Sequence, residues 1–237
     1  MRIISGKLPF LFIAVLAVLF FSFPPSVRAQ EIITADRYME ILSDHYGTIR
    51  DYEARVIIRS GSSDMNGHLS FLNPNFLRID FTRPADQVIC YNGDLLTIYL
   101  PEYRVVLNQE ITNQRPSAAT GASMASAQGL SLLRRNYIPS FVSGPDPMPL
   151  DDNSIELVVK LRLTRRSVSE GYREIILSVN PETRLIRRIE GRTIADALVR
   201  FDFFEIRANL GIPPGRFIYD SPASANVVNN FMFRDTD

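Results

Sequence analysis

Residues 73–106 constrain the fold of this chain most, because they predict four consecutive antiparallel strands. From residue 77 to 81 apolar and polar residues alternate, which is typical of a strand with one buried and one solvated face. Residues 88–91 predict the next strand, and Asn92-Gly93 then predicts a tight type I′ hairpin. The strand before residues 88–91 and the strand after them each carry alternating apolar residues, which are Leu77, Ile79, Phe81, Leu96, Ile98 and Leu100.

The chain beyond residue 30 extends this β pattern. Thr34 predicts the N-cap of an amphipathic helix that ends near Gly47. A long insertion, rich in Pro, Ser, Ala and Gly, spans residues 111–150 and contains a predicted helix at 123–137, and such insertions are commonly lids or binding loops. Further strands are expected at residues 52–58, 69–71, 155–163, 172–179, 185–190, 193–206 and 217–219.

These elements predict a mainly β protein with a small α content. We expect one domain over residues 30–237, with about ten or eleven strands in an open, strongly curved antiparallel half-barrel. The two predicted helices would cover this half-barrel, and the insertion at 111–150 would supply the helical lid.

The first 29 residues predict a secretory signal peptide. Two cations precede an apolar run from residue 8 to 23, and residues 27–29 have the spacing of a cleavage site. The apolar run is shorter than the ~20 residues of a membrane span. We expect cleavage after Ala29 and a soluble mature protein, which would lack an N-terminal lipid because no Cys follows the cut.

Charge and cysteine content exclude several classes of protein. The chain has 26 Lys and Arg against 26 Asp and Glu, so it offers no overall positive field to nucleic acid or to anionic lipid headgroups. Cys90 is the only cysteine, so packing must stabilise the domain without an internal disulfide. After the predicted cut Lys160 is the only lysine, and all other cationic side chains are arginines. This leaves open whether the guanidinium groups recognise a partner or the preference for Arg over Lys has no function.

No group of residues indicates an enzyme. Residues 121–125 approach a nucleophile elbow but lack its second Gly, and His45 and His68 show no metal-ligand spacing. In Asp151-Asp152 we favour a solvated turn over a catalytic pair. We therefore expect no catalytic residues, no metal and no cofactor. Solvated surface is also favoured over partner contact for the pairs Arg134-Arg135 and Arg187-Arg188.

The predicted architecture implies an apolar pocket. A barrel of about eight strands fills its interior with its own side chains, whereas about eleven strands leave a lumen. Two helices of roughly 15 residues fill only part of that volume, so a concave apolar site is expected, although each lining residue could be a plain core position instead. The candidate lining residues are Val56, Ile58, Leu77, Ile79, Phe81, Leu96, Ile98, Leu132, Leu133, Phe201 and Phe203.

Within residues 73–106 a Pro, an Arg or aromatic residue, a second Pro, a Gly turn and an aromatic strand follow one another without a gap, at Pro74, Phe76 to Arg78, Pro84, Asn92-Gly93 and Tyr99. In this order the stretch resembles the LolA family of periplasmic lipoprotein carriers. In the best-known members an Arg directly precedes the first Pro and latches a helical lid, whereas this chain has Asn73 there. The resemblance therefore leaves Arg78 and Arg83 as candidate latch residues.

This resemblance implies a soluble periplasmic carrier that shields the acyl chains of lipoproteins and moves them from the inner to the outer membrane. It also implies the partners: acylated lipoproteins, an inner-membrane ABC-type release complex and an outer-membrane acceptor. We expect a monomer with no nucleic-acid partner. Two alternatives stay open, namely an envelope-stress sensor or interaction module that uses the same open barrel, and a free-lipid binding protein; an enzyme is the least favoured class.

Overall fold

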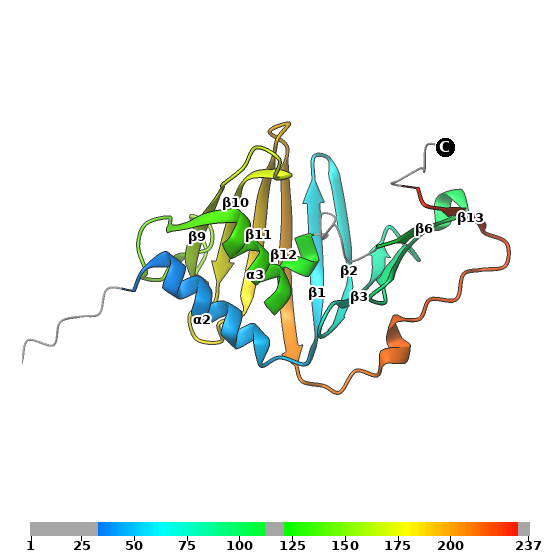
Figure 1. Cartoon of the computed structure of the whole chain (residues 1–237), viewed down its shortest axis with the longest axis horizontal. Helices are drawn as coiled ribbons and strands as arrows, with labels where there is room; N and C mark the ends of the chain where they lie inside the picture. Colours follow the sequence, from blue (N-terminus) through cyan, green and yellow to red (C-terminus); the bar gives the residue numbers. More distant parts are fainter. Residues whose placement is uncertain (1–32, 112–120, 232–237) are drawn as a thin grey trace, which may run out of the picture. The chain divides into compact units, whose positions relative to one another are not determined.

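The computed structural model describes residues 33–111 and 121–231; the predicted signal peptide lies outside them. Within this part, two α-helices, α2 (Ala35–Gly47) and α3 (Ala127–Asn136), lie against one face of a large sheet (Figure 1). Neither they nor the short 3-10 turns η1 (Pro101–Tyr103), η2 (Gly121–Met124) and η3 (Pro214–Phe217) have the length and hydrophobicity needed to cross a bilayer.

The described residues form thirteen strands that belong to one open sheet. The strand order is β13-β6-β5-β4-β3-β2-β1-β12-β11-β10-β9-β7, and β8 pairs with β9 off this path. The strands are β1 (Asp51–Ser60), β2 (Ser63–Leu72), β3 (Phe76–Arg83), β4 (Val88–Tyr91), β5 (Leu95–Leu100), β6 (Val105–Glu110), β7 (Tyr137–Phe141), β8 (Met148–Pro149), β9 (Leu157–Arg165), β10 (Tyr172–Val179), β11 (Ile186–Thr193), β12 (Leu198–Ala208) and β13 (Asn226–Asn229).

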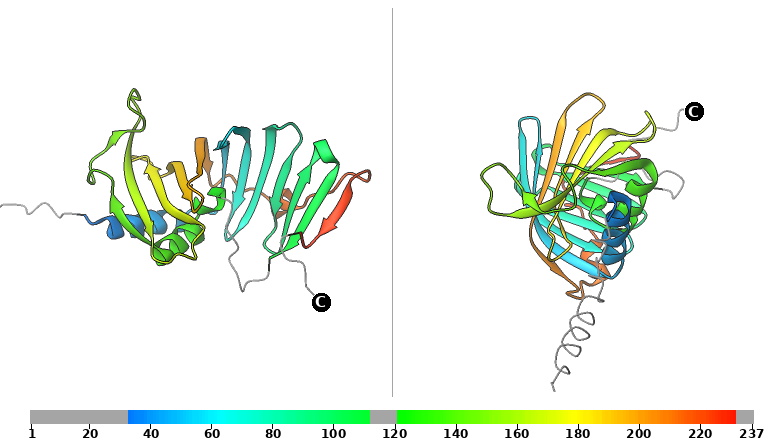
Figure 2. Two further views of the ribbon diagram at one scale, coloured as in Figure 1. Left: turned by 90° about the horizontal axis from the view of Figure 1, so that it is seen from above. Right: turned by 90° about the vertical axis from the view of Figure 1, so that its left-hand side faces the viewer.

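All neighbouring strands are antiparallel except β13 and β6, which are parallel. The sheet curls around the two helices and does not close, because β13 and β7 stand at opposite ends of the strand order (Figure 2). The predicted open, curved antiparallel sheet is therefore confirmed, and it has more strands than were expected. We call the face that carries α2 and α3 the inner face and the opposite one the outer face.

Both helices begin at a side-chain cap. Thr34 Oγ1 accepts a hydrogen bond from the Arg37 amide at 3.2 Å, and Ser126 Oγ accepts one from the Gly129 amide at 3.0 Å. Gly129 lies so close to η2 that a Cβ there would clash with the carbonyl of Ser123. The buried helical residues recur at the three- and four-residue spacing of one helix face: Ala35, Met39, Leu42 and Tyr46 in α2, and Gly129, Leu130 and Leu133 in α3.

The loop between β4 and β5 differs from the predicted type I′ hairpin. Tyr91 pairs with Leu96, so the loop spans residues 92–95, and of the predicted dipeptide only Gly93 has a positive φ. Asn92 Oδ1 instead accepts hydrogen bonds from the amides two and three residues later, at 3.2 and 2.9 Å. An Asx turn therefore replaces the tight hairpin.

The last third of the chain also corrects two predictions. Residues 193–206 are not one strand, because a turn at 194–197 separates β11 from β12. Residues 217–219 are not a strand either; Phe217 ends η3 and is only 1% exposed, since it packs on the outer face with Val88 and Cys90. Cys90 is thus a buried apolar side chain, as expected, and its thiol lies 3.2 Å from the Phe217 carbonyl.

Candidate binding face

The register of the sheet joins the predicted apolar residues into continuous rows on the inner face. Residues directly opposite one another on adjacent strands point to the same side of a sheet. Pairing from β1 to β5 therefore places Tyr52, Phe71, Leu77, Tyr91 and Leu96 in one row. The neighbouring row, which reaches β6, consists of Ala54, Leu69, Ile79, Ile89, Ile98 and Leu107.

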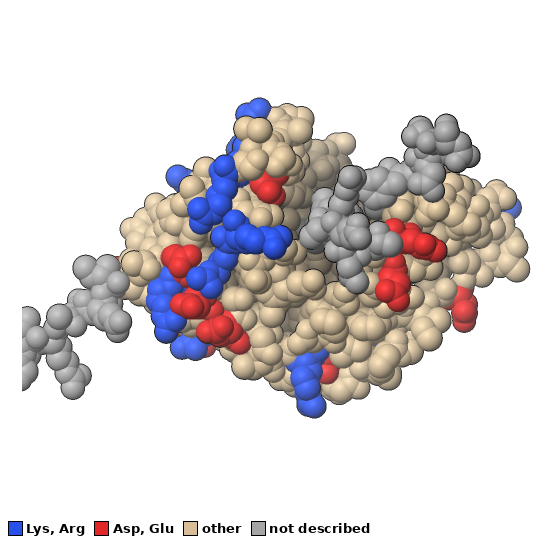
Figure 3. Space-filling model, viewed as in Figure 1, with Lys and Arg blue, Asp and Glu red and all other residues tan. Residues whose placement is uncertain are grey.

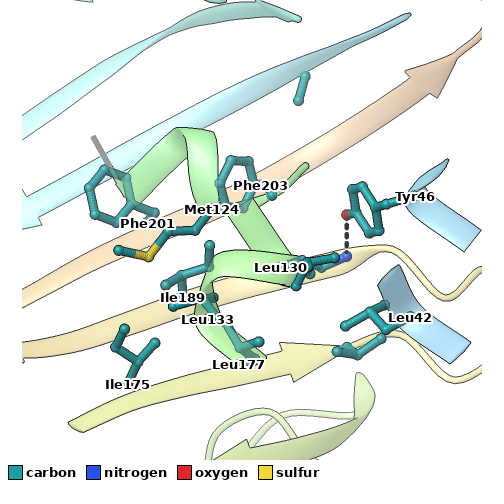
Figure 4. Close-up of a cluster of buried hydrophobic side chains, with 14 of the residues drawn as sticks. Leu42, Tyr46, Met124, Leu130, Leu133, Ile175, Leu177, Ile189, Phe201 and Phe203 are labelled. Atoms are coloured by element: carbon teal, nitrogen blue, oxygen red, sulfur yellow. Dashed lines mark hydrogen bonds between the residues drawn. The ribbon is translucent and has the colours of Figure 1, made fainter. Parts of the chain in front are cut away.

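At their β1–β3 end these rows belong to a buried cluster that also contains the helices. Figure 1 shows α2 and α3 in front of β9–β12, and beneath them the side chains of both helices and the sheet form one buried cluster (Figure 4). This half of the inner face is filled by protein side chains in the present arrangement. The predicted lining residues that belong to the buried cluster are Val56, Ile58, Leu77, Ile79, Phe81, Leu133, Phe201 and Phe203.

Toward their β6 end, the described residues place no α-helix in front of the rows (Figure 1). Apolar side chains of the same rows are only half-buried there. Two of them, Leu96 and Ile98, were predicted from alternation, whereas the other three become apparent only once the register is known. We call this set the open apolar face: Ile89, Tyr91, Leu96, Ile98 and Leu107.

Of the two leucines predicted to line the site from α3, only one is buried. Leu133 is buried, but Leu132 is half-exposed and lies outside the buried cluster. The second buried leucine is Leu130, with 0% exposure, which stands one helical turn from Leu133. The three-residue spacing of Leu130 and Leu133 is the sequence signal that could have identified the pair.

Few hydrogen bonds tie the helical elements to the sheet in the described residues. The Tyr46 hydroxyl of α2 accepts from the Ile186 amide at 2.8 Å, and the Tyr52 hydroxyl of β1 donates to the carbonyl of Ala125, beside α3, at 2.8 Å. Burial raises the pKa of Tyr46, so its hydroxyl stays protonated. The two helices are joined by an ion pair between Arg134 and Asp36 at 3.2 Å. Apolar packing therefore holds the helices down.

The structure places Arg78, one of the two candidate latch residues, against another part of the chain than the helices. Its guanidinium lies on the outer face, where it pairs with Asp80 at 2.8 Å and donates to the carbonyls of Arg216 and Ile218 at 3.1 and 3.4 Å. It thus holds the segment 209–225, which follows β12, and none of its described contacts is with α2 or α3. Arg83, the other candidate, is exposed and forms no ion pair with the described residues.

We expect Arg78→Ala to loosen this segment without unfolding the sheet. The loss of two charge-assisted bonds to carbonyls is worth about 2 kcal/mol locally, or roughly a thirtyfold faster cleavage by a protease acting on the opened segment. Limited proteolysis, with fragments mapped to residues 209–225, measures this. Arg83→Ala serves as the matched control and should leave the cleavage rate unchanged; equal effects of the two variants would contradict the assignment.

The attachment of segment 209–225 should also depend on pH, because Asp80 pairs both with Arg78 and with Arg216 of that segment. Burial would raise the pKa of Asp80, but Arg78 and Arg216 outweigh it and hold the pKa below its usual value. A carboxyl whose pKa is lower in the folded than in the unfolded protein stabilises the folded state at any pH above its pKa in the unfolded protein. This stabilisation is lost as the pH falls through its pKa in the folded protein. The segment should therefore stay attached at neutral pH.

A network of buried charges lies elsewhere on the outer face. Asp202 is 1% exposed and accepts from Arg188 Nε at 2.6 Å and from Arg187 and Arg59 at 3.2 Å each. Arg188 also forms a bidentate pair with Asp151, at 2.7 and 3.1 Å. Burial would lower the pKa of Arg188, but its two carboxylate partners outweigh this and raise it.

This network overturns the prediction that Arg187 and Arg188 are solvated. Their side chains are only 14% and 7% exposed. The register between β10 and β11 shifts here, since Ser178 pairs with Arg188 while Val179 pairs with Ile186. Arg187 is the extra residue of this bulge, and it reaches the same carboxylate as Arg188. Simple alternation could not have predicted two adjacent residues with one partner.

A cavity of about 360 Å³ lies where β11 and β12 separate. β12 stays paired with β1 as far as Ala208, but its last partner on β11 is Arg188, opposite Asp202. The lining combines Leu185, Ile186, Phe203 and Ile206 with three charged residues, Glu156, Arg187 and Glu205. These charges distinguish the cavity from the concave apolar site predicted for an acyl chain. No group of metal-ligating side chains is found in the described ranges.

These features define a class: an open, curled antiparallel sheet with helices across half of its inner face and apolar rows on the other half. No family model and no curated protein sequence matches the chain. Among solved structures, the fold is similar to an uncharacterised conserved protein from Thermus thermophilus, with a TM-score of 0.52, 12% identity, and coverage of 80% of this chain and 98% of that one.

Two further similar structures carry names. MucB matches with a TM-score of 0.51 and 14% identity over 82% of this chain, which spans 65% of the MucB chain. A LolA superfamily protein from Nitrosomonas europaea matches with a TM-score of 0.43 and 15% identity, over 79% of this chain and 98% of that one. At identities of 12% and 14%, the likeness to the Thermus thermophilus protein and to MucB concerns the fold alone.

Proposed function

We propose that this protein is a carrier that binds the acyl chains of lipoproteins on its inner face and shields them from water. The observation that supports this most directly is the open apolar face, a half-exposed continuation of rows that are buried at their β1–β3 end. Apolar side chains on a concave sheet are the expected contacts of an aliphatic ligand. The protein itself would perform no chemistry.

The way in which the helices are attached supports uptake of a long chain. The helix-covered cluster adjoins the open apolar face through Leu77 and Ile79, which lie in the same rows as Leu96 and Ile98. Since apolar packing and few hydrogen bonds hold α3 on the sheet, a hydrocarbon chain can replace its contacts with contacts of the same kind. We propose that α3 moves aside as the chain advances from the open apolar face.

The energy of acyl burial determines how such a carrier must work. Each buried CH₂ contributes about 0.8 kcal/mol, so a sixteen-carbon chain is worth on the order of 12 kcal/mol relative to water. Release into water would be far too slow for transport. The carrier would therefore receive its cargo from a membrane-bound donor, an inner-membrane ABC-type complex, and pass it by direct contact to an outer-membrane acceptor in the periplasm.

Mass spectrometry of extracts from the purified protein tests this proposal. We expect acyl chains or lipoproteins to co-purify, and the protein to bind a fluorescent triacylated lipopeptide in a displacement assay. A protein that is consistently empty, and that neither binds the lipopeptide nor releases lipoproteins from spheroplasts, would rule the carrier out. Binding of free fatty acids without lipopeptide would instead favour a free-lipid protein, and capture of a non-acylated protein would favour an interaction module.

A further inference from the structure

One end of the sheet brings arginines and exposed apolar residues together. The register places the start of β7 beside the end of β9, since Tyr137 pairs with Arg165. It also places the start of β10 beside the end of β11, since Tyr172 pairs with Thr193. The C-terminus of α3 and the tips of the β9–β10 and β11–β12 hairpins therefore meet at this end, which we call the tip surface and which is uppermost in Figure 1.

Several bonds hold the tip surface in shape. The Arg166 amide donates to the Asn136 carbonyl at 2.9 Å, and Arg166 Nε donates to the Tyr137 carbonyl at 3.1 Å. The Tyr137 hydroxyl donates to the Tyr172 carbonyl at 3.3 Å. The arginines are thus carried on bonded strand ends, and their positions relative to one another are defined before any ligand binds.

Positive charge dominates the tip surface. Figure 3 shows Lys and Arg side chains gathered in a band that runs across α3 toward the hairpin tips. Of the carboxylates here, Glu170 is hydrogen-bonded to Asn136 at 3.4 Å and Asp196 is paired with Arg192 at 3.3 Å. Four arginines of the tip surface form no ion pair with any described carboxylate: Arg135, Arg165, Arg166 and Arg173.

Exposed apolar residues lie among these arginines. Val168, at the tip of the β9–β10 hairpin, is 81% exposed, and Ile194, in the next hairpin, is 56% exposed. Ile138 of β7 and Leu198 at the start of β12 are exposed as well. Bulky apolar side chains at protruding tips, surrounded by cations, suit the interface of a bilayer, where hydrocarbon lies beneath a layer of phosphates.

We propose that the tip surface docks the protein on a membrane rich in anionic phospholipids. Guanidinium groups pair with lipid phosphates in a bidentate manner, and a negative surface potential attracts a cluster of them over about a Debye length. Val168 and Ile194 enter the outermost hydrocarbon. The protein thereby meets a membrane with the C-terminal end of α3 facing it, which goes beyond the binding of acyl chains proposed above.

Co-sedimentation of the mature protein with vesicles tests the docking. We expect binding to vesicles of phosphatidylcholine mixed with phosphatidylglycerol, little binding to pure phosphatidylcholine, and loss of binding at molar salt. The double variant Arg165→Glu/Arg166→Glu should bind at least about tenfold more weakly. Arg184→Glu, an exposed arginine in the β10–β11 turn at the opposite end of the strands, is the matched control and should bind as the wild type does.

A second pair of variants tests the docking even if the Arg165→Glu/Arg166→Glu variant fails to fold. Val168→Ser should weaken vesicle binding, whereas Ile155→Ser, which replaces a fully exposed residue just before the opposite end of β9, should not. Ile98→Asp should retain docking even if acyl binding is lost. Equal binding to neutral and anionic vesicles, equal effects of the paired variants, no binding at all, or loss of docking in Ile98→Asp would each overturn the proposal.

Discussion

Replacement of Ile98 by Asp is expected to abolish binding of a lipopeptide while the protein stays folded. Ile98 is half-buried at the centre of the open apolar face, between Ile89 and Leu107 on the neighbouring strands. A bound acyl chain would bury the new carboxylate without a partner, which costs several kcal/mol and should weaken binding by about a hundredfold or more. Displacement of a fluorescent triacylated lipopeptide measures the effect.

The matched control for this variant lies on the same strand. Leu95→Asp introduces the same charge, but Leu95 pairs with Glu110 and points to the outer face by alternation. It should bind the lipopeptide like the wild type. In both variants the free energy of unfolding should change by only about 1 kcal/mol, since neither residue is fully buried. Unchanged binding by Ile98→Asp would remove the open apolar face as the binding site.

Replacement of Asp202 by Ala is expected to cause a large loss of stability. The substitution leaves Arg188 buried without its 2.6 Å partner and also removes a contact of Arg187 and of Arg59. Breaking a buried pair by removing one partner costs about 3–5 kcal/mol, and we expect the lower end because Asp151 still binds Arg188. Chemical denaturation followed by circular dichroism gives the change in the free energy of unfolding.

Asp64→Ala is the control for this prediction. Asp64 pairs with Arg59 at 3.3 Å, but both side chains are nearly half exposed, so its loss should cost less than about 1 kcal/mol. The double variant Arg188→Leu/Asp202→Leu should recover part of the stability, because apolar residues of similar size avoid the desolvation of a buried charge. If Asp202→Ala proves no more destabilising than Asp64→Ala, the network does not stabilise the sheet.

Leu77 illustrates why a candidate site residue must be judged from its surroundings. Alternation places Leu77 on the same face as Leu96, and the register confirms that the two lie in one row. Yet Leu77 is 2% exposed within the buried cluster, whereas Leu96 is half-buried. A charge at Leu77 should therefore unfold the protein rather than only block a ligand. The difference depends on which distant segments pack against each position in the assembled sheet, and no local pattern encodes that.

The arginines show the same limit. The sequence marks Arg78, Arg187 and Arg188 as polar residues on or beside strands, where solvation is the usual expectation. Arg78 instead binds a segment some 140 residues later in the chain, and a bulge turns Arg187 and Arg188 toward one carboxylate. These partners are brought together by strand pairing over long sequence separations.

Short-range patterns in the chain were enough to predict the alternation of the strands, the N-cap of α2, the mainly β class and the apolar character of the inner face. These depend on residues within a few positions of one another, where backbone geometry alone sets the spacing. Assembly of the sheet was needed to show that β1 pairs with β12, which strands lie under the helices, and which apolar residues stay half-exposed. Those outcomes depend on which distant segments meet, because burial is a property of the whole assembled sheet.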